Sequence, residues 1–293
     1  MTKVVALGGG HGLAATLQAV RRYAEEVTAI VSVADDGGSS GRLRAAFGIS
    51  PPGDLRRCLV ALADPTSLWT SAFEHRFAAG ELEGHALGNL VIAGLADATG
   101  DFSVALAEAG RLVGAVGRVL PATRYPVVLK AVVRAGDGTA GDPIEGQVAV
   151  AACGRIAGVS LVPADAEPVP EAIEALAEAD QIVIGPGSLF TSLLAVTVVP
   201  AIRNALEVTP ARKIYVCNLR EQQPETSGYD VAAHVEALGA HGVRVDTVVS
   251  DPDGLQIGRL PDGITGVQAP VSRPDGMAHD PQKLADALEN LVG

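Results

Sequence analysis

Glycine-rich turns follow short apolar runs in this sequence, and such turns can bind an anion. The run Val4–Leu7 ends at Gly8–Gly12, after which apolar residues recur at helical spacing. Glycine lets the backbone approach a diphosphate, and the start of a helix offers free N–H groups. Gly10–Ala15 also fits the loose signature of an NAD-type dinucleotide site, and a tight turn without a ligand is the alternative. The candidate contacts here are Gly9, Gly10, His11 and Gly12.

A second polar segment, Asp35–Gly41, follows the apolar run 27–33. An acidic residue after such a strand often accepts the ribose hydroxyls of a nucleotide. Two adjacent carboxylates can instead hold Mg²⁺, the one cofactor that the sequence suggests. The alternative is a solvated acidic loop. The candidate ligand contacts are Asp35, Asp36, Gly37, Ser39 and Ser40, and the first two are also the candidate metal ligands.

Two predicted helices carry further polar candidates. Asp54 begins a helix after a Pro-Pro-Gly turn, where it is an N-cap or a ligand contact. One of Arg56 and Arg57 would face away from the core, free to bind a phosphate or to remain solvated. His85 and Asn89 lie four residues apart on one face of an apolar helix, so they contact a ligand or are satisfied by the backbone. No second His or Cys nearby has zinc spacing.

The strongest signal in the second half is the turn Gly185–Ser188 between an apolar strand and a predicted helix. This arrangement is again typical of an anion site, although a capped helix is the alternative. Ser188 is not a nucleophile elbow because no glycine follows two residues later. The candidate donors are Gly187, Ser188 and Thr191, and Asn218 is a further polar candidate directly after another strand.

These turns can meet only if a parallel sheet positions them. Apolar strands alternate with helices over residues 4–33 and 171–250, which indicates parallel crossovers. The turns at the carboxyl ends of such strands converge at one edge. The segment at about 119–162 alternates instead and predicts a small β-rich insertion. We therefore predict a single α/β domain over 1–293, with a Rossmann-like three-layer parallel sheet, the insertion and extra helices.

Bulk composition narrows the class of protein. Of 293 residues, 48% are hydrophobic, so the chain can bury a large core. The net charge of −12, without a basic run, argues against a nucleic-acid partner. Three scattered cysteines, no stretch long enough for a membrane span, and a strand that begins directly after Met1–Lys3 lead us to expect a cytoplasmic protein.

Taken together, the motifs resemble the YvcK branch of the YvcK/CofD family, the gluconeogenesis factors, over nearly the whole chain. The resemblance is carried, in order, by Leu7–Leu13, Val33–Leu43, Pro51–Arg56, Gly84–Leu90 and Gly185–Ser192. Two positions depart from the family: His11 stands where Thr is common, and Ala278 where Arg is often found. If that Arg binds a diphosphate in relatives, this chain uses another donor or binds the diphosphate more weakly.

The resemblance implies a CofD-like fold, often dimeric, in a cytoplasmic protein that binds UDP-sugars such as UDP-N-acetylglucosamine and supports cell shape and wall synthesis. Our leading hypothesis is accordingly a regulatory nucleotide-sugar-binding protein, with a homodimer as its expected state. The sister CofD branch transfers a phospholactyl group from a guanosine diphosphate donor with Mg²⁺. The rival hypothesis is therefore a transferase in which Asp54 or His85 is a candidate base, and the third is an NAD-type binder.

Overall fold

A seven-stranded parallel sheet forms the centre of the computed structural model, which describes residues 1–134 and 139–292. Its order is β10-β9-β8-β7-β1-β2-β3, and every neighbouring pair is parallel. The central strands β1 and β7 are apolar apart from their first residues, Lys3 and Gln181, because both of their faces are covered. The strands are β1 (Lys3–Gly8), β2 (Glu26–Val31), β3 (Arg118–Pro121), β7 (Gln181–Ile184), β8 (Arg212–Val216), β9 (Thr247–Ser250) and β10 (Thr265–Gln268).

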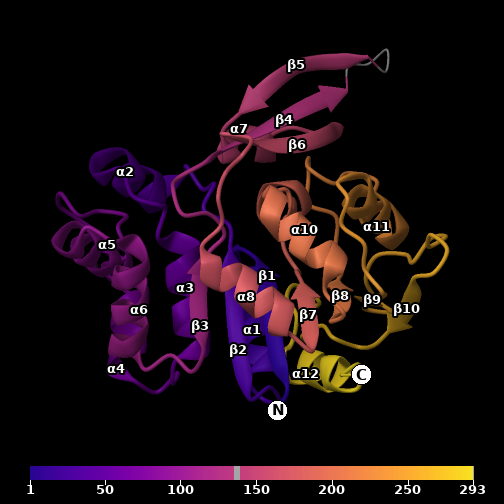
Figure 1. Ribbon diagram of the computed structural model, residues 1–293, viewed down its shortest axis with the longest axis horizontal. Coiled ribbons are helices and arrows are strands. Elements are labelled where there is room, and N and C mark those ends of the chain that lie inside the picture. Colours follow the sequence, from indigo (N-terminus) through magenta and orange to yellow (C-terminus); the bar gives the residue numbers. More distant parts are fainter. Residues whose placement is uncertain (135–138, 293) are drawn as a thin grey trace.

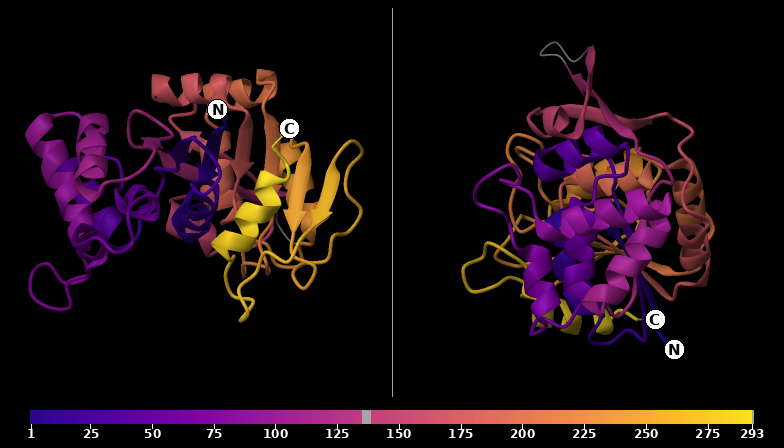
Figure 2. Two further views of the ribbon diagram at one scale, coloured as in Figure 1. Left: turned by 90° about the horizontal axis from the view of Figure 1, so that it is seen from below. Right: turned by 90° about the vertical axis from the view of Figure 1, so that its left-hand side faces the viewer.

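Helices cover the two faces of this sheet, so the predicted three-layer Rossmann-like fold is confirmed (Figure 2). One layer contains α1 (Gly10–Val20), α3 (Gly53–Leu62) and α12 (Pro281–Glu289). The opposite layer contains α8 (Pro170–Glu178), α9 (Leu194–Thr197) and α10 (Pro200–Val208). Between them, Leu7, Ile30, Ile184 and Tyr215 are completely buried. Helix α11 (Val231–Ala240) stacks His234 on Tyr215, with ring centroids 6.4 Å apart.

The strand order reverses between β1 and β7. From β1 the chain moves outward through β2 to β3, then returns to pair β7 with the other side of β1 and continues outward to β10. Such a reversal leaves a crevice outside the carboxyl ends of the two central strands, because their connections leave in opposite directions. The turns after β1 and β7 border that crevice.

The extra helices lie mainly between β2 and β3. They are α2 (Gly38–Phe47), α4 (Leu68–Glu74), α5 (Leu87–Thr99) and α6 (Phe102–Val113). The last three form a group beside the sheet, at the left of Figure 1. Helix α2 begins inside the segment that the sequence predicts as a polar turn. Ser39 and Ser40 are therefore buried residues in a helical first turn.

The β-rich insertion stands apart from the main sheet, at the top of Figure 1. Its strands β4 (Val128–Arg134), β5 (Ala140–Glu145) and β6 (Ile156–Val162) pair antiparallel in the order β5-β4-β6, and α7 (Gln147–Ala151) joins β5 to β6. The predicted range of about 119–162 starts too early. β3 overlaps the start of that range but pairs in parallel with β2 as an edge strand of the main sheet.

Across the described residues, no single helix has both the length and the apolar character needed to cross a membrane. One bent pair of helices, Leu189–Thr197 with Pro200–Val208, is long and apolar enough to do so when the two are taken together, by length and composition alone.

Candidate functional site

The glycine turns after β1 and β7 touch each other. A side chain at Gly12 would collide with the backbone carbonyl of Pro186, and one at Gly187 would lie 3.6 Å from the carbonyl oxygen of Gly9. Gly185 and Gly187 have positive φ angles of 81° and 152°, which glycine adopts at low cost. The two turns thus form one continuous surface at the crossover of the sheet.

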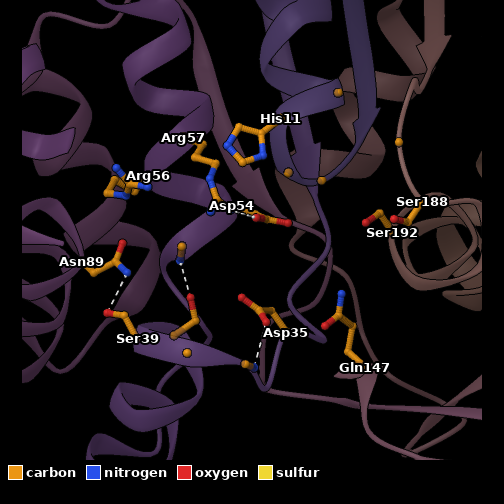
Figure 3. A pocket seen from close by; sticks show the side chains of 18 of the residues that line it. His11, Asp35, Ser39, Asp54, Arg56, Arg57, Asn89, Gln147, Ser188 and Ser192 are labelled. Atoms are coloured by element: carbon orange, nitrogen blue, oxygen red, sulfur yellow. Dashed lines mark hydrogen bonds and ion pairs between the residues drawn. The ribbon is translucent and has the colours of Figure 1, made fainter. Parts of the chain in front are cut away.

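A cavity of about 480 Å³ opens beside these turns (Figure 3). Most of the residues predicted from sequence line it: Gly9, Gly10, His11, Gly12, Asp35, Gly37, Ser39, Ser40, Asp54, Arg56, Asn89, Gly187 and Ser188. Four predicted residues do not line it: Asp36, His85, Thr191 and Asn218. Most of the side chains belong to two groups. We name the lining residues between 35 and 89 the N-terminal wall. The C-terminal wall consists of the lining residues between 187 and 222 together with the residues directly behind them, Phe190, Thr191, Asn218 and Glu225.

Three arginines line the N-terminal wall beside two aspartates. Arg56 is 3% exposed, and its Nη1 donates to the carbonyl of Phe73 (3.2 Å) and to the carboxylate of Glu74 (2.9 Å). Its buried Nε has no hydrogen-bond partner among the described residues. Arg57 donates to Asp54 at 2.7 Å, and Arg76 also lines the cavity. A guanidinium in this arrangement can bind a phosphate.

A buried polar network lies behind this wall. Asn89 Nδ2 donates to Ser39 Oγ at 3.1 Å, and Ser39 Oγ lies 2.9 Å from His85 Nδ1. Burial, together with Arg42 and Arg76, lowers the pKa of His85 and favours its neutral form. His85 itself does not line the cavity and is linked to it through Ser39. Asn89 Oδ1 is buried without a hydrogen-bond partner in the described part of the chain.

The two adjacent carboxylates after β2 have different roles. Asp35 lines the cavity and accepts from the Gly37 amide at 2.9 Å; burial raises its pKa, and the charge of Asp54 adds to that effect. Asp36 is exposed and accepts from the amide of Val148 in the insertion at 3.0 Å. The predicted metal pair Asp35 and Asp36 is therefore separated, because successive side chains of the turn point to different neighbours.

Asp35 and Asp54 are a better-placed pair of oxygen donors for Mg²⁺. Both line the same cavity, and two carboxylates with phosphate oxygens suit this ion. Within residues 1–134 and 139–292, no group of three or more His, Cys, Asp or Glu side chains is placed to hold a metal. A metal here would consequently depend on oxygen ligands from a bound phosphate.

The C-terminal wall is closed by its own side chains. The amides of Phe190 and Thr191, in the π-helix η1 (Leu189–Leu193), donate to the buried carboxylate of Glu225 at 2.8 and 3.0 Å. Asn218 accepts from the Gly187 amide at 3.0 Å and donates to its carbonyl at 2.9 Å. Thr191, predicted as a donor to phosphate, and Asn218, predicted as a further polar contact, therefore hold the turn from behind the first cavity.

A second cavity of about 370 Å³ lies across the glycine turns. It shares His11, Gly12, Gly187 and Gln222 with the first, and Asn218 and His279 also line it. The ring nitrogen Nε2 of His279 lies 3.2 Å from the carbonyl of Cys217. Burial lowers the pKa of His279 to about 4, so the ring is neutral at pH 7.

Several lining residues were not among the sequence candidates. Ser192 belongs to the Gly185–Ser192 motif, and its spacing from Ser188 could have indicated it. Gly38, Gly53 and Arg57 lie in or beside the motifs Asp35–Gly41 and Pro51–Arg56, whereas Gln147, Gln222 and Arg76 carry no chemical signature in their local sequence. Glu225, which supports the cavity from behind, also has no recognisable signature in its local sequence. These residues are brought to the site by the tertiary fold.

The fold and the cavity define a Rossmann-like α/β protein with a glycine- and arginine-containing site at its strand crossover. A family model described as 2-phospho-L-lactate transferase CofD matches residues 4–261. The chain therefore belongs to the CofD/YvcK family, as its motifs predict.

Known proteins agree with this assignment. The gluconeogenesis factor of Bacillus subtilis is 44% identical over 243 residues, which cover 82% of this chain and 74% of that protein. A Mycobacterium leprae protein, provisionally named as such a factor, is 43% identical over an alignment of 309 residues that covers 98% of this chain and 85% of that protein. The crystal structure of a UPF0052 family member from Bacillus halodurans has a TM-score of 0.89 and 36% identity, covering 99% of both chains.

Proposed function

We propose that this protein binds a nucleotide-sugar diphosphate, such as UDP-N-acetylglucosamine, in the first cavity and acts as a regulatory protein. The volume of this cavity, about 480 Å³, lies in the range of small-molecule sites. Glycine amides after β1 and the arginines of the N-terminal wall suit a diphosphate, and Asp35 suits ribose or sugar hydroxyls. These local donors allow a protein with a net charge of −12 to attract an anion.

One observation carries the proposal. Arg56 and Asn89 both line the cavity, and each carries a buried polar atom, Nε and Oδ1 respectively, that has no hydrogen-bond partner among the described residues. An unsatisfied buried polar atom costs about 1–3 kcal/mol, and more when the group is charged. A ligand offering both an acceptor and a donor would recover this free energy.

Calorimetry with UDP-N-acetylglucosamine, GDP and NAD, each with and without Mg²⁺, tests the proposal. We expect the UDP-sugar to bind without Mg²⁺ and to be recovered unchanged by chromatography. NAD as the only ligand would contradict the proposal and favour a dinucleotide site, which the Gly10–Ala15 pattern allows.

The second candidate is an Mg²⁺-dependent transferase that uses a nucleotide diphosphate donor. It is favoured by the family match and by the pair Asp35 and Asp54 in the cavity. If bound there, Mg²⁺ would neutralise phosphate charge. Asp54 could hold the ion or accept a proton, whereas His85 lies behind Ser39. Strict Mg²⁺ dependence with consumption of the donor would support this candidate.

The cellular role follows the same proposal. As a relative of gluconeogenesis factors, the protein would be cytoplasmic and homodimeric, and would link nucleotide-sugar levels to cell shape and wall synthesis. Light scattering of the purified protein would test the dimer. Deletion of the gene, followed by growth on a gluconeogenic carbon source, would test the role.

A further inference from the structure

The insertion contributes one polar side chain to the first cavity. Gln147 is the first residue of α7, between two antiparallel strands of the insertion, yet it lines the cavity together with residues of the main sheet. In Figure 3, its amide is directed toward the space between Asp35 and Ser192. This side chain therefore faces the ligand side of the cavity.

The side-chain carboxamide of Gln147 is available to a ligand. This carboxamide makes no hydrogen bond with any residue in the described parts of the chain. A carboxamide offers two donors and one acceptor oxygen, so it can pair with hydroxyl groups and amides, which both donate and accept. Asp35, on the other side of this space, has a carboxylate that accepts from hydroxyls.

The main body holds α7 in place. Asp36 accepts from the amide of Val148, directly after Gln147, and thus caps α7 from outside the insertion. Gly37 also leaves room for Val148, since a side chain there would lie 3.1 Å from a Val148 methyl group. At the other end of the insertion, His241 Nε2 accepts from the Val159 amide at 3.1 Å.

We propose that Gln147 is a specificity-determining residue that contacts the hydroxyl- or amide-bearing sugar part of the ligand, and that Asp36 is its positioning residue. The proposal rests on the nucleotide-sugar function proposed above. It assigns a role to the insertion, which contributes a carboxamide to a cavity whose other lining residues lie outside the insertion. It also explains why adjacent Asp35 and Asp36 have different neighbours.

Calorimetry with UDP-N-acetylglucosamine and with UDP, which lacks the sugar, tests the roles. Gln147→Ala should weaken binding of the UDP-sugar about fivefold to tenfold, as for the loss of one or two hydrogen bonds, and leave UDP binding unchanged. Asp36→Ala should reproduce this selective loss, and the double variant should lose no more than either single variant. Asp142→Ala removes an exposed carboxylate of the same insertion away from the cavity and should behave like the wild type.

The outcomes separate the two proposals. If the wild type does not bind UDP-N-acetylglucosamine, the proposed function fails and this inference fails with it. If the wild type binds the UDP-sugar and Gln147→Ala retains full affinity, or loses UDP affinity equally, only this inference is overturned. Additive losses in the double variant would overturn the positioning role of Asp36. Thermal unfolding of each variant, compared with Asp142→Ala, shows that the variants are folded.

Discussion

The two walls of the cavity differ in whether their buried polar groups have hydrogen-bond partners. In the N-terminal wall, Arg56 Nε and Asn89 Oδ1 are buried without partners within the described chain. In the C-terminal wall, the carboxylate of Glu225 already occupies the amides of Phe190 and Thr191, and Asn218 occupies both polar groups of Gly187. The N-terminal wall therefore has unpaired polar atoms that a ligand could satisfy. In the C-terminal wall, the hydrogen bonds within the protein fix the shape of the turn.

This difference shows that a glycine turn followed by a helix is not by itself a phosphate site. The turn after β7 has the sequence of an anion site, and the anion that binds its η1 amides is a side chain of the same protein. The charge of a ligand would then be recognised mainly on the arginine side, and the two walls should respond differently to substitution.

The largest effect is expected at Arg56. Arg56→Ala should lower affinity for the UDP-sugar roughly a hundredfold, about 3 kcal/mol, because charged hydrogen bonds in a buried site are lost. Arg56→Lys keeps the charge but has no Nε donor, so most of the loss should remain. Calorimetry measures both variants, and wild-type affinity in Arg56→Ala would show that the N-terminal wall does not bind the charge.

Acid should destabilise the C-terminal side through His279. The folded-state pKa of about 4 lies below the ordinary value of 6.5, so the unfolded chain binds more protons between these values. The stabilisation from His279 is thus present above pH 6.5 and is lost as pH falls toward 4, by up to about 3 kcal/mol. Urea unfolding of the wild type and His279→Gln at several pH values measures the difference, and parallel pH profiles would contradict it.

Removing Glu225 should affect stability more than binding. Glu225→Ala leaves two backbone amides without an acceptor and should reduce the free energy of unfolding by about 2 kcal/mol. Glu225→Gln keeps an acceptor oxygen and should lose less. Urea unfolding and calorimetry together check this, and a tenfold loss of affinity without loss of stability would mean that Glu225 contacts the ligand.

The smallest effect is expected for hydroxyls of the C-terminal wall. Thr191→Ala should leave affinity unchanged because its hydroxyl and amide face Glu225. Ser188→Ala should weaken binding roughly twofold to threefold, about 0.5 kcal/mol, as for one exposed hydrogen bond. If the double variant lost as much affinity as Arg56→Ala, the comparison of the walls would be wrong.

Sequence patterns predict the sheet and its two glycine turns because both are local. Buried parallel strands are continuous apolar runs, and a turn between strand and helix needs glycine. Local patterns do not predict α2, since its Gly-Ser start has low helix propensity. They also cannot separate Asp35 from Asp36, or find Gln147 and Glu225, because those roles are set by contacts with distant segments.

The contact between Gly12 and Pro186 joins the first and last parts of the chain, which meet only in the folded sheet. A chain cut between β3 and β4 would give two fragments, each with one of these turns and neither with a complete cavity. A small molecule that touches both turns would favour reassembly of the halves, so a split version of this protein could report the molecule's concentration through fragment complementation.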